Sequence, residues 1–128
     1  MNTIQLGLLI LSALGAITEA YFDAKKIIKN KVITHTLSAL VRGVCAIGLS
    51  FLFFRGVAYP LLVSASNLIM FWMVFDVAIN LFRGMSINYI GKTAFLDRMA
   101  RKIGADGQGY LALKGVFLVI VLTILNYL

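Results

Sequence analysis

The chain has few charged residues, a single cysteine and a single proline. Of its 128 residues, 13% are charged and 61% are hydrophobic, and the mean hydropathy is +0.94. Soluble domains have about 25% charged residues, so this chain lacks the polar surface that a water-soluble globule needs. The lone Cys45 excludes an intrachain disulfide and any metal site built from several thiolates. We expect Cys45 to be a small, buried packing residue.

Long apolar runs take up most of the chain. Four of them approach the roughly 20 residues that a helix needs to cross a hydrocarbon core of about 30 Å. The alternation of polar and apolar residues that is typical of a membrane barrel strand does not occur. The sequence therefore predicts an all-α integral membrane protein, a four-helix transmembrane bundle that forms a single domain over residues 1–128. The predicted spans are about 3–24, 34–54, 60–82 and 110–128.

Small residues predict a helix contact in the first run and a break before the fourth. Ser12, Ala16 and Ala20 recur at four-residue spacing. Because such a pattern lets another helix approach closely, we expect this face to pack against a neighbour. Ahead of the fourth run, Gly104, Gly107 and Gly109 are expected to break the chain, since glycine disfavours a helix.

The cations are concentrated on one predicted side of the membrane. That side carries Lys25, Lys26, Lys29, Lys31, Arg83, Lys92, Arg98, Arg101, Lys102 and Lys114, and the opposite side carries Arg55. Cytoplasmic loops of membrane proteins hold the excess of Lys and Arg. The pattern predicts a multi-pass protein of the cell inner membrane, with loops 25–33 and 84–109 in the cytoplasm and both termini outside, in the periplasm. Because topology accounts for the net charge of +7, nucleic acid is not an expected partner.

Residues 93–103 predict a short amphipathic helix at the cytoplasmic interface. Thr93 suits the N-cap, and Gly104 suits the position just past the helix end. The apolar side chains expected on one face are Phe95, Leu96, Met99 and Ile103. The cations expected to contact anionic lipid headgroups are Lys92, Arg98, Arg101 and Lys102. A short solvated connecting helix is the alternative interpretation.

Polar side chains form one stripe on each of the first three predicted spans, near its cytoplasmic end. The stripes are Glu19 with Asp23, His35 with Ser38 and Arg42, and Asp76 with Asn80 and Arg83. An ionisable residue inside a span costs roughly 2.5–3.5 kcal/mol on insertion scales and usually faces the bundle interior. We therefore expect an intramembrane ion pair of Arg42 with Asp76 or Glu19. With histidine neutral, Arg42 and the three carboxylates carry a formal charge of −2, which suits a cation or a transferable proton.

Three interpretations of this polar cluster stay open. In the first, the side chains pair across helices and fix the packing only. In the second, a divalent metal is the cofactor, and its ligands come from Glu19, Asp23, His35, Asp76 and Asn80. Water bound to that metal could hydrolyse a lipid phosphate. In the third, Glu19 or Asp76 titrates in an ion or proton pathway. The sequence supports no nucleophilic triad, so catalytic residues stay unknown and an enzyme is the less favoured class.

Several spaced motifs resemble small multi-pass membrane proteins of phages and prophages, chiefly those of Bacteroidetes hosts. The motifs are Glu19-x-x-x-Asp23, Ile33-Thr34-His35, Arg42-Gly43, Phe75-Asp76-x-x-x-Asn80-x-x-Arg83-Gly84 and Gly91-Lys92-Thr93-Ala94-x-x-Asp97-Arg98. The resemblance implies a bacterial or viral membrane protein and supplies no activity. It favours a phage role, as a holin-like lysis protein, a virion membrane component or a superinfection factor.

The function expected from these observations is the binding or movement of a small cation or proton by a small integral membrane protein. A phage-type membrane protein, either a structural component of the virion or holin-like, is the first alternative. A metal-dependent enzyme that acts on lipid phosphates is the second. Besides membrane lipids, the expected partner is a second copy of the chain or another membrane protein. A virion membrane is the alternative location.

Overall fold

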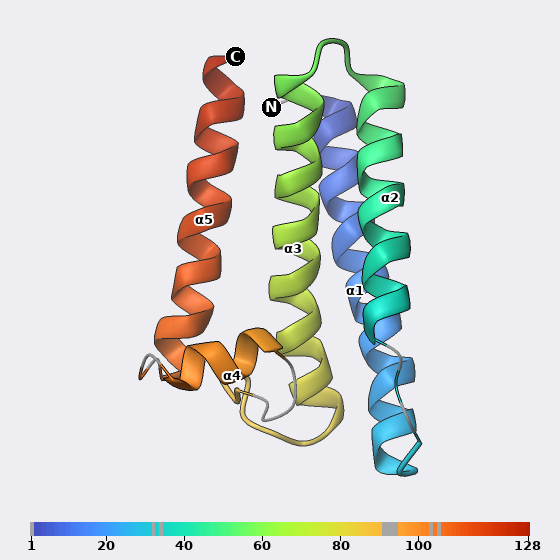
Figure 1. Ribbon diagram of the computed structural model, residues 1–128, viewed down its shortest axis with the longest axis vertical. Coiled ribbons are helices and arrows are strands. Elements are labelled where there is room, and N and C mark those ends of the chain that lie inside the picture. The colour runs from blue at the N-terminus through green and yellow to red at the C-terminus, as the bar shows by residue number, and fades with distance from the viewer. Residues whose placement is uncertain (1, 32, 34, 91–94, 103, 105) are drawn as a thin grey trace.

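The computed structural model describes residues 2–31, 33, 35–90, 95–102, 104 and 106–128. Within these ranges it consists of helices without strands (Figure 1). The helices are α1 (Thr3–Ile28), α2 (His35–Phe53), α3 (Ala58–Phe82), α4 (Phe95–Lys102) and α5 (Gly107–Tyr127). By length and composition, α1, α3 and α5 can each cross a membrane, and α2 contains a shorter apolar stretch. The chain is therefore an all-helical, membrane-embedded protein.

Helix α3 is the centre of the arrangement. In Figure 1 it stands between α2 and α5, with α1 behind, and the four long helices run side by side. Among the described residues, the extensive contacts between helices are those of α3 with α1, α2 and α5. Both termini and the α2–α3 connection lie at one end of the molecule, whereas α4 lies across the other end. The expected four-helix bundle is thus three helices that each pack on a common fourth.

The α1–α3 contact is built from small side chains. Ala16, Ala20 and Ala24 of α1 are fully buried at four-residue spacing. Ala20 and Ala24 pack against Ala78 and Ile79 of α3. Small residues bring two backbones close enough for dispersion attraction along the whole seam, which matters in a membrane because lipid tails are as apolar as the helices. The predicted small-residue face is confirmed at Ala16 and Ala20, Ser12 is half-buried, and Ala24 extends the face.

Two further apolar clusters hold α5. Near the termini, Leu8 of α1, Val63 of α3 and Leu125 of α5 are packed together. Near the opposite end, Ile90, Ala100 of α4 and Tyr110 of α5 form a second cluster. Because Trp72 of α3 packs against that second cluster, α4 joins the ends of α3 and α5.

Two helix boundaries differ from the sequence prediction. Helix α1 continues to Ile28, so Lys25 and Lys26 are helical and lie in its last turn, where the helix dipole favours cations. Helix α5 begins at Gly107, and the prediction that Gly107 and Gly109 break the chain is wrong. The side chain of Asp106 caps α5 by accepting a hydrogen bond from the Gly109 N–H at 2.6 Å. Such a cap stabilises a helix by about 1 kcal/mol and offsets the cost of a glycine.

Cys45 is exposed, so the prediction that it is a buried packing residue is wrong. Cys45 lies on α2, and among the described residues the extensive contact of α2 is with α3. Most of the α2 surface therefore faces outward. In a membrane this surface contacts lipid tails, and a small thiol is compatible with them.

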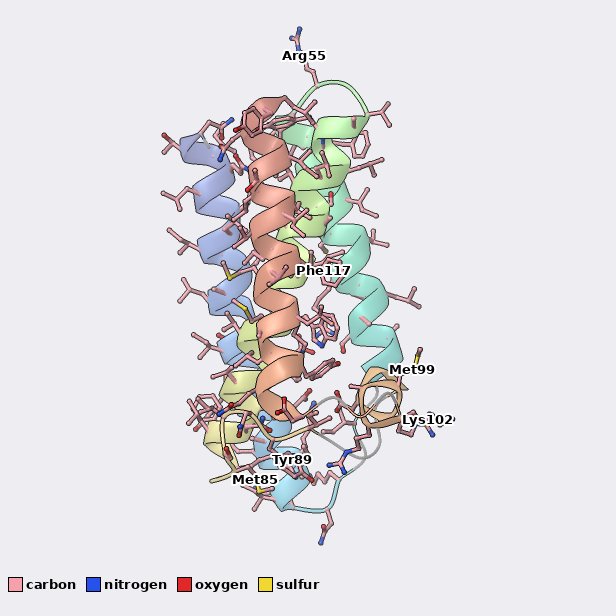
Figure 2. The ribbon with its side chains drawn as sticks, turned by 90° about the vertical axis from the view of Figure 1, so that its left-hand side faces the viewer. Arg55, Met85, Tyr89, Met99, Lys102 and Phe117 are labelled. Carbon is pink, nitrogen blue, oxygen red and sulfur yellow. The ribbon has the colours of Figure 1, made fainter. Side chains whose placement is uncertain are left out.

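The short amphipathic helix is present as α4, and Figure 2 shows Met99 and Lys102 projecting outward from it. Its apolar face is divided, because Ala100 is buried while Met99 is exposed. Gly104 has a φ of +74° and its N–H donates to the Arg101 carbonyl at 3.2 Å, as expected for the residue past a helix end. The predicted cap Thr93, the side chains of Phe95 and Leu96, and Ile103 lie outside the described residues.

We expect Ala20→Leu to lower the free energy of unfolding by about 1–3 kcal/mol, because a larger side chain overpacks the seam. Ala112→Leu adds the same atoms to an exposed position of α5 and should change the free energy of unfolding little. Reversible unfolding in mixed detergent micelles measures both. Equal losses for the two variants would show that the α1–α3 seam is not closely packed.

Candidate functional site

Two ion pairs lie inside the apolar helices, on different sides of α3. The guanidinium of Arg42 on α2 donates to the carboxylate of Glu19 on α1. The ammonium of Lys114 on α5 donates to the carboxylate of Asp76 on α3. Of the two partners expected for Arg42, the structure therefore places Glu19 against it and gives Asp76 a cation of its own. One such bridge ties α1 to α2, and the other ties α3 to α5.

Arg42 has an aromatic contact as well as a carboxylate. Its guanidinium carbon lies 4.4 Å from the centroid of the Phe71 ring of α3. Phe71 is stacked on Phe75, one turn further along α3, with 5.9 Å between ring centroids. A guanidinium over an aromatic face gains about 0.5–2 kcal/mol, more as water is removed. Arg42 thus has two stabilising neighbours from two helices.

Lys114 is the most deeply buried cation among the described residues, with 2% of its surface exposed. Its ammonium lies 4.1 Å from the ring centroids of both Trp72 and Tyr110. The Tyr110 hydroxyl donates to the Asp97 carboxylate of α4 at 3.4 Å. One carboxylate and two aromatic faces therefore replace the water that the ammonium would have in solution.

Lys114 was predicted to be a cation of the third loop and its flanks, and its pairing with Asp76 was not predicted from the sequence. The signal was present as two stripes of four-residue spacing, Trp72 with Asp76 on α3 and Tyr110 with Lys114 on α5. An acid next to an aromatic on one helix, facing a base next to an aromatic on another, makes a complementary surface.

Asp23 and Asn80 are buried but have local partners. Asp23, with 4% of its surface exposed, accepts from the ammonium of Lys26, one turn along α1, at 3.4 Å. The Asn80 amide donates to the backbone carbonyls of Tyr89 at 2.9 Å and Ile87 at 3.4 Å. Asn80 therefore closes the loop that follows α3, and its amide nitrogen is committed to backbone groups.

The expected surplus of negative charge is balanced in the structure. Glu19, Asp23 and Asp76 are matched by Arg42, Lys26 and Lys114, one cation to each carboxylate. Among the described residues, no three His, Cys, Asp or Glu side chains gather as a metal site would require. The metal site predicted from Glu19, Asp23, His35, Asp76 and Asn80 is thus not assembled by the described atoms, because Glu19 and Asp23 line the groove between α1 and α2 whereas Asp76 is paired with Lys114 of α5. His35 begins α2, and its side chain lies outside the described part of the chain.

A groove of about 840 Å³ runs between α1 and α2. Glu19 and Asp23 both line it, together with Thr18, Lys26 and Ser38 among mostly apolar side chains. Because Lys26 lies in the last turn of α1 and Glu19 lies two turns further in, the groove leads from the end of the helix to the Glu19–Arg42 pair. Two carboxylates are therefore placed in sequence along one cavity.

Polar side chains continue beyond the ion pair, toward the end that holds the termini. The buried ones are Gln5, Ser50, Ser64, Ser66 and Asn67. The hydroxyls of Ser50 and Ser64 both donate to the Ala46 carbonyl, at 2.7 and 3.2 Å. The amide nitrogen of Gln5 and the amide oxygen of Asn67 have no hydrogen-bond partner among the described atoms. Buried polar atoms of this kind are usually satisfied by ordered water.

The cations predicted to contact lipid headgroups have different environments. Arg98 and Lys102 are exposed on α4. Arg101 donates to the Ile90 carbonyl at 2.6 Å and so also anchors α4 to the preceding loop. Lys92 lies outside the described residues.

No protein-family model, curated protein or solved structure matches this chain. The resemblance to phage membrane proteins stays a prediction, and the chemistry of the site has to be inferred from its geometry.

We expect Lys114→Met to destabilise the protein, because it leaves the Asp76 carboxylate without its cation. Loss of one partner of a buried pair costs about 3–5 kcal/mol, and the partial exposure of Asp76 favours the lower end of this range. Lys102→Met, at an exposed position, is the control.

The double variant Asp76→Leu, Lys114→Met should be more stable than Lys114→Met, because an apolar pair carries no desolvation penalty. The free energy of unfolding of each single variant and of the double variant completes a double-mutant cycle. Additive losses would mean that Asp76 and Lys114 are not energetically coupled.

Proposed function

We propose that the chain is a small integral membrane protein that moves protons through the space between α1, α2 and α3, with Glu19 as the exchanging group. The observation that carries this proposal is the groove in which Asp23 and then Glu19 follow one another inward from the end of α1. Ionisable residues inside membrane spans that line a cavity commonly belong to ion or proton pathways.

Charge balance favours a proton over a metal cation. The groove contains the carboxylates of Glu19 and Asp23, and the cations paired with them are Arg42 and Lys26. A metal cation that entered the groove would therefore meet carboxylates that are already neutralised. To bind, it would have to displace the Arg42 or Lys26 side chain from its carboxylate. A proton needs no such displacement, because it can bind to the Glu19 carboxylate while Arg42 stays charged.

Arg42 is placed to accommodate both states of Glu19. When the carboxylate is charged, it accepts a hydrogen bond from the guanidinium. When the carboxylate is protonated, the ring face of Phe71 still stabilises the guanidinium. Arg42 thus lowers the cost of losing its ionic partner, which a reversible proton carrier requires.

The buried polar groups between Glu19 and the termini are the natural continuation of the route. Asn67 lies one turn of α3 from Phe71, the ring beside Arg42. Ser64 lies a further turn toward the termini, where its hydroxyl and that of Ser50 meet at the Ala46 carbonyl. Asn67 and Gln5 each have a buried amide atom without a hydrogen-bond partner among the described atoms. Water bound at these positions could relay a proton to the opposite side of the membrane.

For the orientation we propose the one expected from the cations, with both termini outside and α4 at the cytoplasmic face of a bacterial inner membrane. Figure 2 shows Arg55 at one end of the molecule and Lys102 at the other, and the termini lie at the Arg55 end in Figure 1. The groove then opens toward the cytoplasm.

Proton flux can be measured in liposomes that contain the protein and a pH-sensitive dye, with a potassium gradient and valinomycin as the driving force. Wild-type protein should conduct protons, and Glu19→Gln should reduce the flux to that of empty liposomes because the exchanging carboxylate is gone. Asp97→Asn, which removes a carboxylate from α4 outside the groove, should keep wild-type flux. Equal flux in wild type and Glu19→Gln would contradict the proposal.

Asp23→Asn serves as a second variant in case Glu19→Gln, which leaves Arg42 unpaired, fails to fold. The Asp23 carboxylate is paired with Lys26, which is half-exposed and stays solvated, so we expect a folded protein with reduced flux. Release of a large co-encapsulated dye by the wild type would instead support the holin-like alternative, and transport of sodium or potassium without protons would support a cation pathway.

The orientation prediction is tested in a Cys45→Ser background. In intact cells, a membrane-impermeant maleimide should label Arg55→Cys, and it should label Lys102→Cys only after permeabilisation. The reverse pattern would mean that α4 faces outward.

A further inference from the structure

A second groove, of about 480 Å³, lies on a different face of the molecule, where α1, α3 and α5 meet. Ile17 of α1 and Leu111 of α5 form its sides, and residues of α3 between Met73 and Phe82 form its floor. Every side chain that lines it is apolar. It shares no lining residue with the groove that contains Glu19.

A stripe on α1 leads from this groove to a cation. Ile17, Tyr21 and Lys25 follow one another at four-residue spacing and so share a face of the helix. The Tyr21 ring meets the ring of Phe82, a lining residue, edge to face, with 5.5 Å between centroids. The Lys25 ammonium lies 4.2 Å from the centroid of the Tyr21 ring. The groove therefore ends in an aromatic pair with an exposed ammonium above it.

The length of the groove matches one leaflet of a bilayer. From Met73 to Phe82 a helix rises about 14 Å, and half of a hydrocarbon core of about 30 Å is about 15 Å. Toward the termini, Leu8, Val63 and Leu125 pack α1, α3 and α5 together, and none of them lines the groove. A transmembrane helix of a second copy would need a groove that runs through both leaflets. A lipid acyl chain needs a groove that runs through one leaflet only.

We infer that this groove binds an acyl chain of an anionic phospholipid from the leaflet that adjoins α4, with the lipid phosphate held by Lys25. The apolar lining accepts the chain, and the lysine at the mouth extends along the Tyr21 ring to the headgroup, as lysines at membrane interfaces do. A cation at the membrane surface favours an anionic over a zwitterionic headgroup. The site uses none of the α4 cations.

The test is native mass spectrometry of the protein released from mixed micelles that contain equal amounts of phosphatidylglycerol and phosphatidylcholine with the same acyl chains. Wild-type protein should retain one lipid, with phosphatidylglycerol preferred. Lys25→Gln should reduce that preference about fivefold while a lipid is still retained. Lys31→Gln, which removes an exposed cation just past the end of α1, away from the Tyr21 ring, should keep the wild-type preference.

Val74→Trp fills the groove and should abolish retention of either lipid. Leu111→Trp fills the same groove from α5 and should also abolish lipid retention. It replaces Val74→Trp in the test if Val74→Trp does not fold. Retention of lipid by folded groove-filling variants, or an unchanged preference in Lys25→Gln, would overturn the inference. A wild-type dimer without lipid, which dissociates on Val74→Trp, would also overturn it and would identify a second copy as the occupant.

Discussion

A charge in an apolar interior has to be neutralised by neighbouring groups, because neither lipid nor packed side chains can solvate it. This constraint organises the described structure around α3. Phe71 and Phe75 form one stripe of α3, which faces Arg42 on α2. Trp72 and Asp76 form another stripe, which faces Lys114 on α5. The helices that carry these two cations, α2 and α5, are each directed to α3 by an acid or an aromatic face.

Helix α1 is held differently and has a different role. Its contact with α3 is the alanine seam, which involves no charge and gives the most extensive contact between two helices of the molecule. Because one face of α1 is committed to this seam, its two flanks stay open. One flank presents Glu19 and Asp23 to the polar groove, and the other presents Ile17 and Tyr21 to the apolar groove.

The two ends of the molecule therefore differ in chemistry. Near the termini, the cluster of Leu8, Val63 and Leu125 closes the helices together. Near the other end, α1 and α3 stay packed through the alanine seam, and the grooves on the two flanks of α1 differ: one contains Glu19 and Asp23, and the other is lined by apolar side chains only. Proton exchange at Glu19 and lipid binding beside Lys25 would both take place at this end, about two helical turns apart along α1.

The sequence by itself determined the class of protein, since apolar runs of spanning length and few charges are properties of composition and need no tertiary contact. It also located the α1 seam through Ala16 and Ala20, and it placed acids and Arg42 inside the helices, because helical periodicity is local. The choice of Glu19 for Arg42, the burial of Lys114 beside Asp76 and the outward position of Cys45 were decided only by the tertiary structure. Each depends on how the helices are rotated about their axes and which of them are neighbours, and those rotations are set by packing and charge pairing between segments far apart in the sequence.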